Sequence, residues 1–488
     1  MAFFRHRISK KYGEFMKLLF VTSEANPYAA SGGLGDVMGA LPAALAEQDD
    51  LDVSVIMPLY NTVAESYRAK MEKVADLSFK LSWRSTGATI YKLCDRGVCY
   101  YFVENHRYFD RCRLYGEYDD GERFAFFSAA VIEFMIQTES YPDVLHANDW
   151  QSALSVIYLK TRYLGNERLS QVKTVFTIHN IEYQGKFGID ILGDLLGIDD
   201  KYRSILEHDR CVNLLKGAVE CADQVTTVSP NYANELKYPF FAFGLSEVIK
   251  SAEHKLTGVI NGIDYGYFSP DKGGDIDFAY NKFSRKAGKK KNKLALLAEL
   301  GLEKYADRPL LVMITRLAAG KGVDLVIHII EELLAKDVTI VILGTGEKQY
   351  ELAFSALEEK YDNLKALITF NRVISKKLYA SADIFLMPSK SEPCGLAQMI
   401  ACSYATIPVV RAVGGLYDSI KSYPAKDSNG FTFDNYNAHD FLFKIYEALE
   451  LYKNTDEWDK LTLRAIKSNF TWEQSAAKYI EIYSKTLG

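Results

Sequence analysis

The sequence lacks a strong charge excess, a paired cysteine motif and a long apolar run, and each absence argues against a class of protein. Its 488 residues carry 58 lysines and arginines against 63 aspartates and glutamates, so no basic surplus points to nucleic acid or to an anionic membrane. No stretch approaches the roughly eighteen consecutive apolar residues of a membrane-spanning helix. We therefore expect neither a nucleic-acid partner nor a membrane partner.

The cysteines are few and do not form a closely spaced motif. The seven are odd in number and scattered, and no CxxC pair occurs among them. This distribution fits a reducing cytosol better than a disulfide framework, and it predicts no metal site and a cytoplasmic location. Residues 1–15 contain several basic residues but are not followed by an apolar core of signal-peptide length, so we interpret them as a ragged extension.

A glycine-rich loop, 31–36, is the most informative feature that is present. It follows the apolar run 18–21 and leads into an apolar-periodic stretch, which predicts a strand-to-helix turn. Glycine permits positive φ and close approach of a ligand, and free amides at a helix start attract an anion. The spacing is neither GxGxxG nor the Walker pattern GxxxxGK[ST]. The loop therefore predicts a binding site for a phosphate-bearing substrate at Gly32 and Gly33, and a turn that serves chain geometry alone remains the alternative.

Two series of short apolar runs predict two doubly wound α/β domains that face one cleft. Helical patterns such as 124–136 separate several of the runs, and this alternation indicates parallel sheets covered on both faces. A turn signature at 261–264 places the domain boundary near 255–265, and we expect the lysine run 289–291 to be a solvated helix start. The predicted strands are 17–22, 52–56, 99–103, 143–146, 173–178, 224–228, 310–314, 339–343, 366–370, 384–387 and 407–410.

Charged residues and glycines follow the strands of the second series. Arg316 and Lys321 come after the strand 310–314, where two cations could neutralise a diphosphate. Glu392 follows the strand 384–387 and could cap a helix or bind hydroxyls. Gly414-Gly415 follows the strand 407–410 and predicts a second amide-lined anion site. Surface charge and helix capping remain the alternative explanations at these positions.

In the first series, His179 closes the strand 173–178 and Asp149-Trp150 follows the strand 143–146. A histidine at a strand end could donate to or accept from a sugar hydroxyl. A structural histidine and simple packing of the tryptophan remain open as alternatives.

These motifs together resemble those of bacterial glycogen synthases and plant starch synthases, which are retaining glycosyltransferases with two Rossmann-like domains in the GT-B fold. The resemblance extends over nearly all of 16–488. The motifs that carry it are Ser31-Gly32-Gly33-Leu34-Gly35-Asp36-Val37, Asn148-Asp149-Trp150, Thr177-Ile178-His179-Asn180, Tyr183-Gln184-Gly185, Val228-Ser229-Pro230, Asn261-Gly262-Ile263-Asp264, Arg316 with Lys321-Gly322, Glu392-Pro393-Cys394-Gly395-Leu396 and Gly414-Gly415-Leu416.

The resemblance implies a hexosyltransferase that moves glucose from ADP-glucose to the non-reducing end of an α-1,4-glucan with retention, without a cofactor. It implies domains at 16–257 (acceptor side) and 258–465 (donor side), and a tail, 466–488, that crosses back to the first. Cys394 could equally be a packing residue. The implied catalytic residues are His179, Arg316, Lys321, Glu392 and Asp149, and the implied substrate-binding residues are Gly32, Gly33, Asp36, Asn261, Phe370, Cys394, Gly395, Leu396, Gly414, Gly415 and Leu416.

Three positions depart from the bacterial pattern. Ala30 stands where that family usually has lysine, Gln151 where histidine is frequent, and Asn148 is an alternative also seen among starch synthases. Two further functions therefore stay open: a UDP-glucose-dependent glucosyltransferase of the same fold, and a catalytically degenerate glucan-binding protein. The presence of Arg316, Lys321 and Glu392 argues against the degenerate binding protein.

Overall fold

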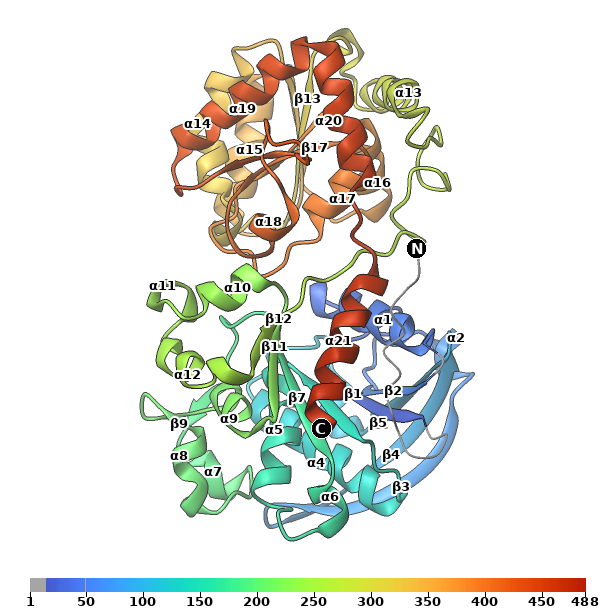
Figure 1. The fold of residues 1–488 in the computed structure, drawn as a ribbon, viewed down its shortest axis with the longest axis vertical. Helices are drawn as coiled ribbons and strands as arrows, with labels where there is room; N and C mark the ends of the chain where they lie inside the picture. Colours follow the sequence, from blue (N-terminus) through green and yellow to red (C-terminus); the bar gives the residue numbers. More distant parts are fainter. Residues whose placement is uncertain (1–14, 49) are drawn as a thin grey trace. The chain divides into compact units, whose positions relative to one another are not determined.

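The structure is a computed structural model that describes residues 15–48 and 50–488, and these form two compact units (Figure 1). The first unit contains the described residues up to Val228, Ala233–Val259 and Trp472–Gly488; the second contains Ser229–Tyr232 and Ile260–Thr471. The domain limits 16–257, 258–465 and 466–488 stay predictions, and the final segment of the first unit begins at Trp472 rather than at 466. Except for Phe15, the predicted extension lies outside the described residues.

The first unit is built on a nine-stranded sheet in the order β12-β11-β7-β6-β1-β2-β5-β4-β3. All neighbours from β12 to β5 are parallel, and β4 is antiparallel to β5 and β3. The strands are β1 (Met16–Val21), β2 (Leu51–Pro58), β3 (Glu72–Leu81), β4 (Arg84–Asp95), β5 (Val98–Glu104), β6 (Val144–Asn148), β7 (Lys173–Ile178), β11 (Gln224–Thr227) and β12 (Leu256–Gly258), with a small separate sheet of β8 (Lys186–Gly188), β10 (Cys211–Asn213) and β9 (Glu207–His208).

The strand order of this sheet reverses between β1 and β6. Connections from β1 lead outward to β2 and β5, whereas those from β6 lead the other way to β7 and β11. The loops after β1 and β6 therefore diverge and leave a gap at the carboxyl edge, where ligands bind in open α/β sheets. These are the loops of 31–36 and of Asn148-Asp149.

The helices of the first unit flank the sheet on both faces (Figure 1). The central helix α4 contains the predicted stretch 124–136, and its residues are nearly all buried. The helices of the first unit are α1 (Gly33–Ala46), α2 (Glu65–Arg68), α3 (His106–Phe109), α4 (Asp120–Gln137), α5 (Trp150–Lys160), α6 (Glu167–Ser170), α7 (Ile191–Asp194), α8 (Arg203–Leu206), α9 (Leu214–Cys221), α11 (Pro239–Ala242), α12 (Ser246–Ser251) and α21 (Trp472–Leu487). Helix α10 (Pro230–Glu235) begins in the second unit.

The second unit is a six-stranded, wholly parallel sheet in the order β15-β14-β13-β16-β17-β18. Its order reverses between β13 and β16, so that the loops after these two strands meet at a second switch point. The strands are β13 (Leu310–Ile314), β14 (Thr339–Leu343), β15 (Leu364–Leu367), β16 (Ile384–Met387), β17 (Ile407–Arg411) and β18 (Phe431–Phe433).

Helices cover both faces of this sheet and bury its apolar strands (Figure 1). Helix α14 places Val326, Ile330 and Leu333 in the core at helical spacing. The helices are α13 (Arg285–Glu299), α14 (Val323–Leu334), α15 (Lys348–Lys360), α16 (Arg372–Ser381), α17 (Ala397–Ser403), α18 (Gly414–Ser419), α19 (Ala438–Lys453) and α20 (Thr455–Lys467).

The prediction that the lysine run 289–291 is solvated is wrong for Lys289, which is 9% exposed. Its ammonium group donates to the carbonyl oxygens of Tyr379, Ala380 and Tyr404 and to the hydroxyl of Thr406, at 2.7 to 3.3 Å. Lys290 and Lys291 are exposed. The run therefore starts on the inner face of α13, where it ties α13 to the segments around α16 and α17.

Replacing Lys289 by methionine should destabilise the protein by about 2–4 kcal/mol, because buried carbonyl groups lose their donor. Burial lowers the pKa of Lys289 to about 7 from its usual 10.5, so between these values the unfolded state binds more protons than the folded state. The stability lost in the variant should therefore grow as pH rises from 7 to 9. Urea unfolding of both proteins at the two pH values tests this, and a difference that shrinks with pH would contradict it.

The prediction of unpaired cysteines is wrong for Cys94 and Cys99, which form a disulfide. The two residues lie directly opposite each other on β4 and β5. The other five cysteines are free. The bond closes a single hairpin and is not a framework for the fold.

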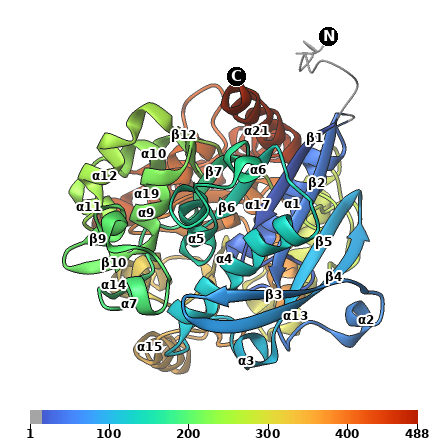
Figure 2. The ribbon, with the colours of Figure 1, turned by 90° about the horizontal axis from the view of Figure 1, so that it is seen from below.

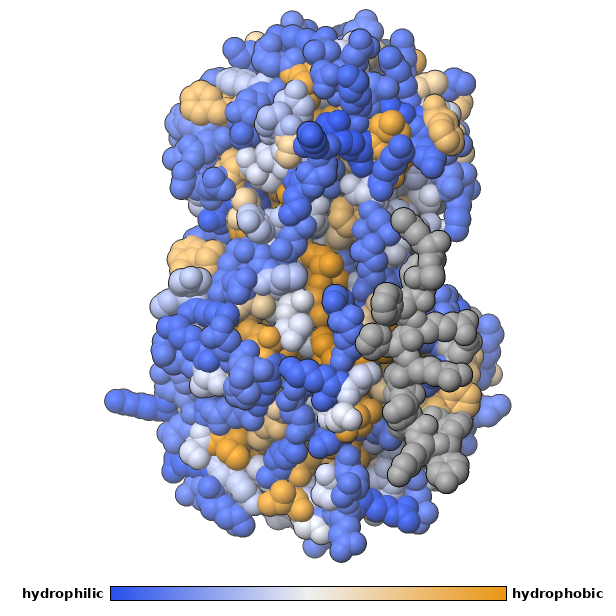
Figure 3. Space-filling view, viewed as in Figure 1, coloured by the Kyte–Doolittle hydropathy of each residue, from blue (hydrophilic) through white to orange (hydrophobic). Residues whose placement is uncertain are grey.

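Within the described ranges, no helix is long and apolar enough to cross a membrane, and no group of three or more His, Cys, Asp or Glu side chains could hold a metal ion. On the face drawn in Figure 3, hydrophobic residues form small groups on a mainly hydrophilic surface.

Candidate active site

The switch point of the second unit is bridged by an ion pair. Lys321, in the loop after β13, donates to Glu392, in the loop after β16, with Nζ 2.7 Å from Oε2. The same carboxylate oxygen accepts from the Ser389 hydroxyl at 3.0 Å. The Glu392 side chain is 9% exposed and that of Lys321 is 33% exposed. The pair therefore fixes two strand-end loops against each other, with the cation at the accessible side.

Gly322 lets these two loops approach. Its φ is +70°, and a Cβ there would lie 2.1 Å from the carbonyl oxygen of Pro388. Any other residue would push the Lys321 loop away from the segment that carries Glu392.

Arg316 stands at the carboxyl end of β13 with its guanidinium unused. The residue is exposed, and its side chain forms no hydrogen bond or ion pair with any other described residue. An uncompensated guanidinium at a switch point is available for an anionic ligand, and its fork geometry matches phosphate.

The turn after Glu392 presents free main-chain amides. The amides of Gly395 and Leu396 have no acceptor among the described residues, and Gly395 has φ +70°. They precede α17, so both hydrogens are available for an anion. The resemblance implies that Gly395 and Leu396 bind substrate, and this stays a prediction.

The second glycine pair has a different structural role from the predicted one. The Gly415 amide already donates to the carbonyl oxygens of Glu392 and Pro393, both at 3.1 Å, and the Leu416 amide donates to that of Val413 at 3.0 Å. Cβ atoms at Gly414 and Gly415 would lie 1.9 Å and 2.1 Å from the carbonyl oxygens of Glu392 and Cys394. The glycines thus let the start of α18 pack on the Glu392 turn, and the amides of Gly415 and Leu416 are both used within the fold.

Asn261 contacts Cys394, which belongs to the turn after Glu392. Asn261 is 5% exposed, and its buried Oδ1 has no hydrogen-bond partner among the described residues. A buried oxygen without a donor is costly, so a ligand hydroxyl is a natural partner. The Asn261 main-chain amide interacts with the Cys394 thiol, whose pKa is raised to about 12 by burial. Its burial and raised thiol pKa argue against Cys394 as a nucleophile.

Phe370 projects from the end of the β15 strand. The strand ends at Leu367, earlier than predicted, and Phe370 lies in the following loop with 80% of its surface exposed. An aromatic ring in such a position can stack on a nucleobase.

In the first unit, the loop after β6 meets the end of β7 through His179. The His179 Nε2 lies 2.9 Å from Oδ1 of Asn148, and the His179 main-chain amide donates to Asp149 Oδ1 at 2.7 Å. Burial lowers the pKa of His179 to about 3, so the ring is neutral at pH 7. His179 and Asp149 thus form one structural unit with Asn148, which the sequence analysis named as a departure from the bacterial pattern but to which it gave no role.

Asp149 is held in an unfavourable environment. Its φ is +57°, and burial raises its pKa to about 7 although the amides of His179 and Asn180 donate to it. Asparagine also offers an acceptor oxygen for these amides, and it carries no charge that burial penalises. A residue kept under such constraint is typical of functional sites.

Replacing Asp149 by asparagine should therefore raise stability and lower activity. Because the pKa of Asp149 is higher in the folded state than the usual 3.8, the native protein loses stability as pH rises from about 4 to 7. The variant, which does not titrate, should gain on the order of 4 kcal/mol relative to the native protein between pH 4 and 8, at about 1.4 kcal/mol for each unit of pKa shift. Calorimetry at several pH values measures this, and a constant difference across that range would contradict it.

The loop 31–36 is held by an acidic residue that the sequence analysis missed. Glu24, 3% exposed, accepts from the Ser31 amide at 2.6 Å and hydroxyl at 2.7 Å, and from the Gly32 amide at 3.2 Å. An acid soon after an apolar strand and before glycines was the available signal. The Glu24 carboxylate therefore occupies the Ser31 and Gly32 amides of the predicted anion site.

Gly32 and Gly33 do not have positive φ, contrary to the reason given for them, but nothing lies within 4 Å of a Cβ added at either. Open space above the loop leaves room for a ligand. Asp36 lies in the first turn of α1 and accepts from the Asn26 side chain at 2.6 Å.

The three departures from the bacterial pattern have different surroundings. Ala30 is exposed, and a Cβ on Gly35 would lie 2.3 Å from that of Ala30. Gln151 is 7% exposed with Oε1 unpartnered. Asn148 is fully buried and bonded.

Comparison with known proteins identifies the family of this chain. The starch synthase catalytic domain model matches residues 17–251, and the glycosyl transferases group 1 model matches residues 301–462. Glycogen synthase of Geobacillus thermodenitrificans is 41% identical over 97% of this chain and 98% of its own. That of Clostridium novyi is 41% identical over 97% and 99%. The chain belongs to the glycogen synthase family.

Solved structures agree with the family. The catalytic domain of starch synthase IV from Arabidopsis thaliana, bound to ADP and acarbose, has a TM-score of 0.88 and 30% identity and covers 97% of this chain and 100% of its own. A sucrose-phosphate synthase from Thermosynechococcus elongatus, with TM-score 0.59 and 16% identity over 96% and 98% of the two chains, shares the fold alone. The predicted GT-B fold and the assignment as a hexosyltransferase of glycogen synthesis are confirmed.

Proposed function

We propose that this glycogen synthase uses ADP-glucose as donor and the non-reducing end of an α-1,4-glucan as acceptor. The observation that carries the proposal is the second unit's switch point, where Lys321 contacts Glu392 and keeps an accessible end. Arg316 belongs to the same loop as Lys321, and its side chain has no partner among the described residues. The starch synthase IV domain bound to ADP and acarbose supports the same pair of ligand classes. Working as a cytoplasmic enzyme is part of the proposal.

The donor diphosphate is assigned to the second unit. Arg316 and Lys321 supply positive charge, and the Gly395 and Leu396 amides supply two donors without a competing acceptor. Each charge-assisted hydrogen bond contributes about 1.5–3 kcal/mol. Phe370 is assigned to the base, because its exposed ring has no apolar cover.

In the second unit, Asn261 and Glu392 are assigned to the glucose ring. In the first unit, His179 and Asp149 are assigned to a sugar hydroxyl. Asn261 offers a buried acceptor without a donor, and Glu392 is fixed by two hydrogen bonds. Asp36 and the open space over Gly32 and Gly33 are assigned to the reacting sugar and its surroundings.

In the transfer, the bond between glucose C1 and the donor's phosphate oxygen breaks, and C1 bonds to the acceptor's 4-hydroxyl oxygen on the same face. The acceptor proton passes to the departing phosphate oxygen, so no protein nucleophile is required. Arg316 and Lys321 stabilise the negative charge that develops on ADP. Exclusion of water from the reacting atoms limits hydrolysis of the donor.

The test is transfer of labelled glucose to glycogen from ADP-glucose and, separately, from UDP-glucose, with release of the nucleoside diphosphate measured in parallel. Incorporation from ADP-glucose at least about tenfold faster than from UDP-glucose is expected, since a tenfold preference needs only one extra contact. Faster incorporation from UDP-glucose would overturn the donor assignment. Glycogen binding without incorporation from either donor would identify a degenerate glucan-binding protein.

A further inference from the structure

Asn148 is the partner that decides how His179 can act. Its side chain is fully buried, and its Nδ2 donates to the carbonyl oxygens of Val21 at 3.3 Å and His146 at 3.1 Å. Both hydrogens of the amide group are therefore used. A flipped amide would place Oδ1 against two carbonyl oxygens, which is repulsive, so the amide has one orientation.

This orientation directs Oδ1 toward the histidine ring. Oδ1 lies 2.9 Å from His179 Nε2, and an amide oxygen can only accept, so Nε2 must carry the hydrogen. The main chain fixes the other end, because the His179 amide donates to Asp149 Oδ1 at 2.7 Å. The ring of a neutral histidine then has its lone pair on Nδ1, and Nδ1 has no hydrogen-bond partner among the described residues.

We propose that Asn148 is a positioning residue that locks His179 in the Nε2-protonated form and so makes Nδ1 an obligatory acceptor for a hydroxyl of the donor sugar. The inference rests on the proposed function only in naming the sugar as the ligand. The contacts of the Asn148 amide fix the tautomer whether or not a sugar binds.

The consequence for specificity is directional. The sugar hydroxyl that meets Nδ1 must donate its proton, so a fluorine or a methoxy group in its place cannot satisfy the site. Sites built around a hydrogen bond to a substrate hydroxyl discriminate strongly against analogues that lack it. A fluorinated donor sugar should be a poor substrate even though fluorine is as small as the hydroxyl.

The direct test is nitrogen NMR of the full-length protein with its histidine rings labelled with ¹⁵N. The His179 signals are assigned by their loss in a His179→Gln variant. At pH 7 the expected spectrum shows protonated Nε2 and unprotonated Nδ1 for His179. A ring protonated at Nδ1, or at both nitrogens, would overturn the proposal without any assay of activity.

A variant pair separates positioning from structure. Asn148→Ala should allow a mixture of tautomers at His179 and lower kcat about tenfold, the equivalent of one hydrogen bond. Asn363→Ala is the matched control, because Asn363 is also buried and its Nδ2 donates to two carbonyl oxygens, of Leu334 and Val338, at 3.1 and 3.0 Å. The control should lose stability but keep the His179 tautomer and kcat.

Each outcome has a defined meaning. A native tautomer in Asn148→Ala would overturn the locking role, and an Asn148→Ala variant that fails to fold leaves the spectrum of the native protein to decide. If the tautomer is as expected but His179→Gln keeps full activity, the locking inference stands and the proposed role of His179 in donor binding fails.

Discussion

Replacing Arg316 by alanine is expected to lower kcat/KM for ADP-glucose by about 10²- to 10³-fold, the usual effect of removing one group that stabilises transition-state charge. The melting temperature should not change, because the guanidinium is exposed and has no partner among the described residues whose contact could be lost. Initial rates and differential scanning calorimetry measure the two quantities. The combination of lost activity with unchanged stability is what distinguishes a ligand-binding arginine from a structural one.

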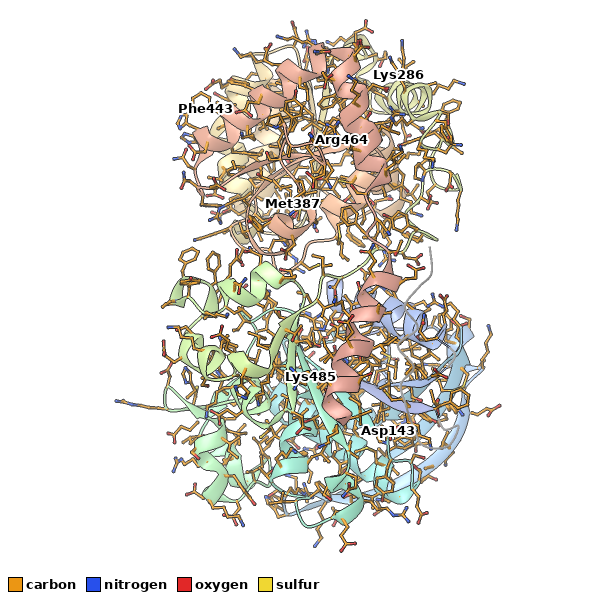
Figure 4. All side chains as sticks on the ribbon, in the orientation of Figure 1. Asp143, Lys286, Met387, Phe443, Arg464 and Lys485 are labelled. Atoms are coloured by element: carbon orange, nitrogen blue, oxygen red, sulfur yellow. A yellow bond between two sulfur atoms is a disulfide. The ribbon has the colours of Figure 1, made fainter. Side chains whose placement is uncertain are left out.

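Lys286→Ala is the matched control for this variant. Lys286 is an exposed cation of the same unit on α13, well away from Met387 at the end of the β16 strand (Figure 4). Its removal changes the net charge as Arg316→Ala does, and it should leave kcat/KM within about twofold, since distant surface charges are screened. An equal loss of activity in both variants would mean that Arg316 acts through general electrostatics and not at the diphosphate.

The Lys321 and Glu392 pair should show strong coupling and an asymmetric stability effect. Lys321→Met leaves the buried Glu392 carboxylate with only the Ser389 hydroxyl, and should cost about 2–3 kcal/mol. Glu392→Gln leaves Lys321, which is one-third exposed and can reach water, and should cost under about 1 kcal/mol. Each change should lower kcat/KM about 10²-fold, and the double variant should lose less than the product.

Urea unfolding and kcat/KM of the two single variants and the double variant complete this cycle. Lys293→Met is the control, because Lys293 pairs with Asp383 at 2.8 Å in a buried bridge that precedes β16, at the opposite edge of the sheet from Glu392. It should lower stability and leave kcat/KM unchanged. Additive effects at Lys321 and Glu392 would contradict their action as one unit.

The parallel strands could be predicted from the sequence because buried strands are continuous apolar runs. The strands β1, β2, β5, β6, β7 and β11 and the strands β13, β14, β16 and β17 lie within a few residues of the predicted ranges. The β3–β4 hairpin was missed, although it is long and clearly visible at the sheet edge in Figure 2. It is an edge element with exposed polar residues, so no continuous apolar run marks it.

Side-chain partners were harder to predict than strand positions. Lys289 looked solvated because it stands in a run of three lysines, and only the packing of α13 turns it inward. The Cys94–Cys99 disulfide depends on two residues facing each other across β4 and β5, and the strand β4 was not predicted. Each error concerns a contact that requires knowledge of the element's neighbours.

In the candidate site, too, positions along the chain could be predicted and contacts between loops could not. Arg316, His179 and Glu392 could be placed at strand ends from the sequence, because each follows an apolar run. They were chosen as candidates because ligands bind at the carboxyl ends of parallel strands. The use of the Gly415 amide inside the fold and the role of Glu24 as anchor of the loop 31–36 could not follow, because both depend on the path of one loop over another.

The measurement that tests the central proposal most directly is proton NMR of the reaction between ADP-glucose and a maltooligosaccharide with the purified protein. The anomeric signal of a new α-1,4 linkage should grow in step with the loss of the donor's anomeric signal and the appearance of ADP, with no free glucose. Release of free glucose without a new linkage, or a new β linkage, would contradict transfer with retention to an α-glucan.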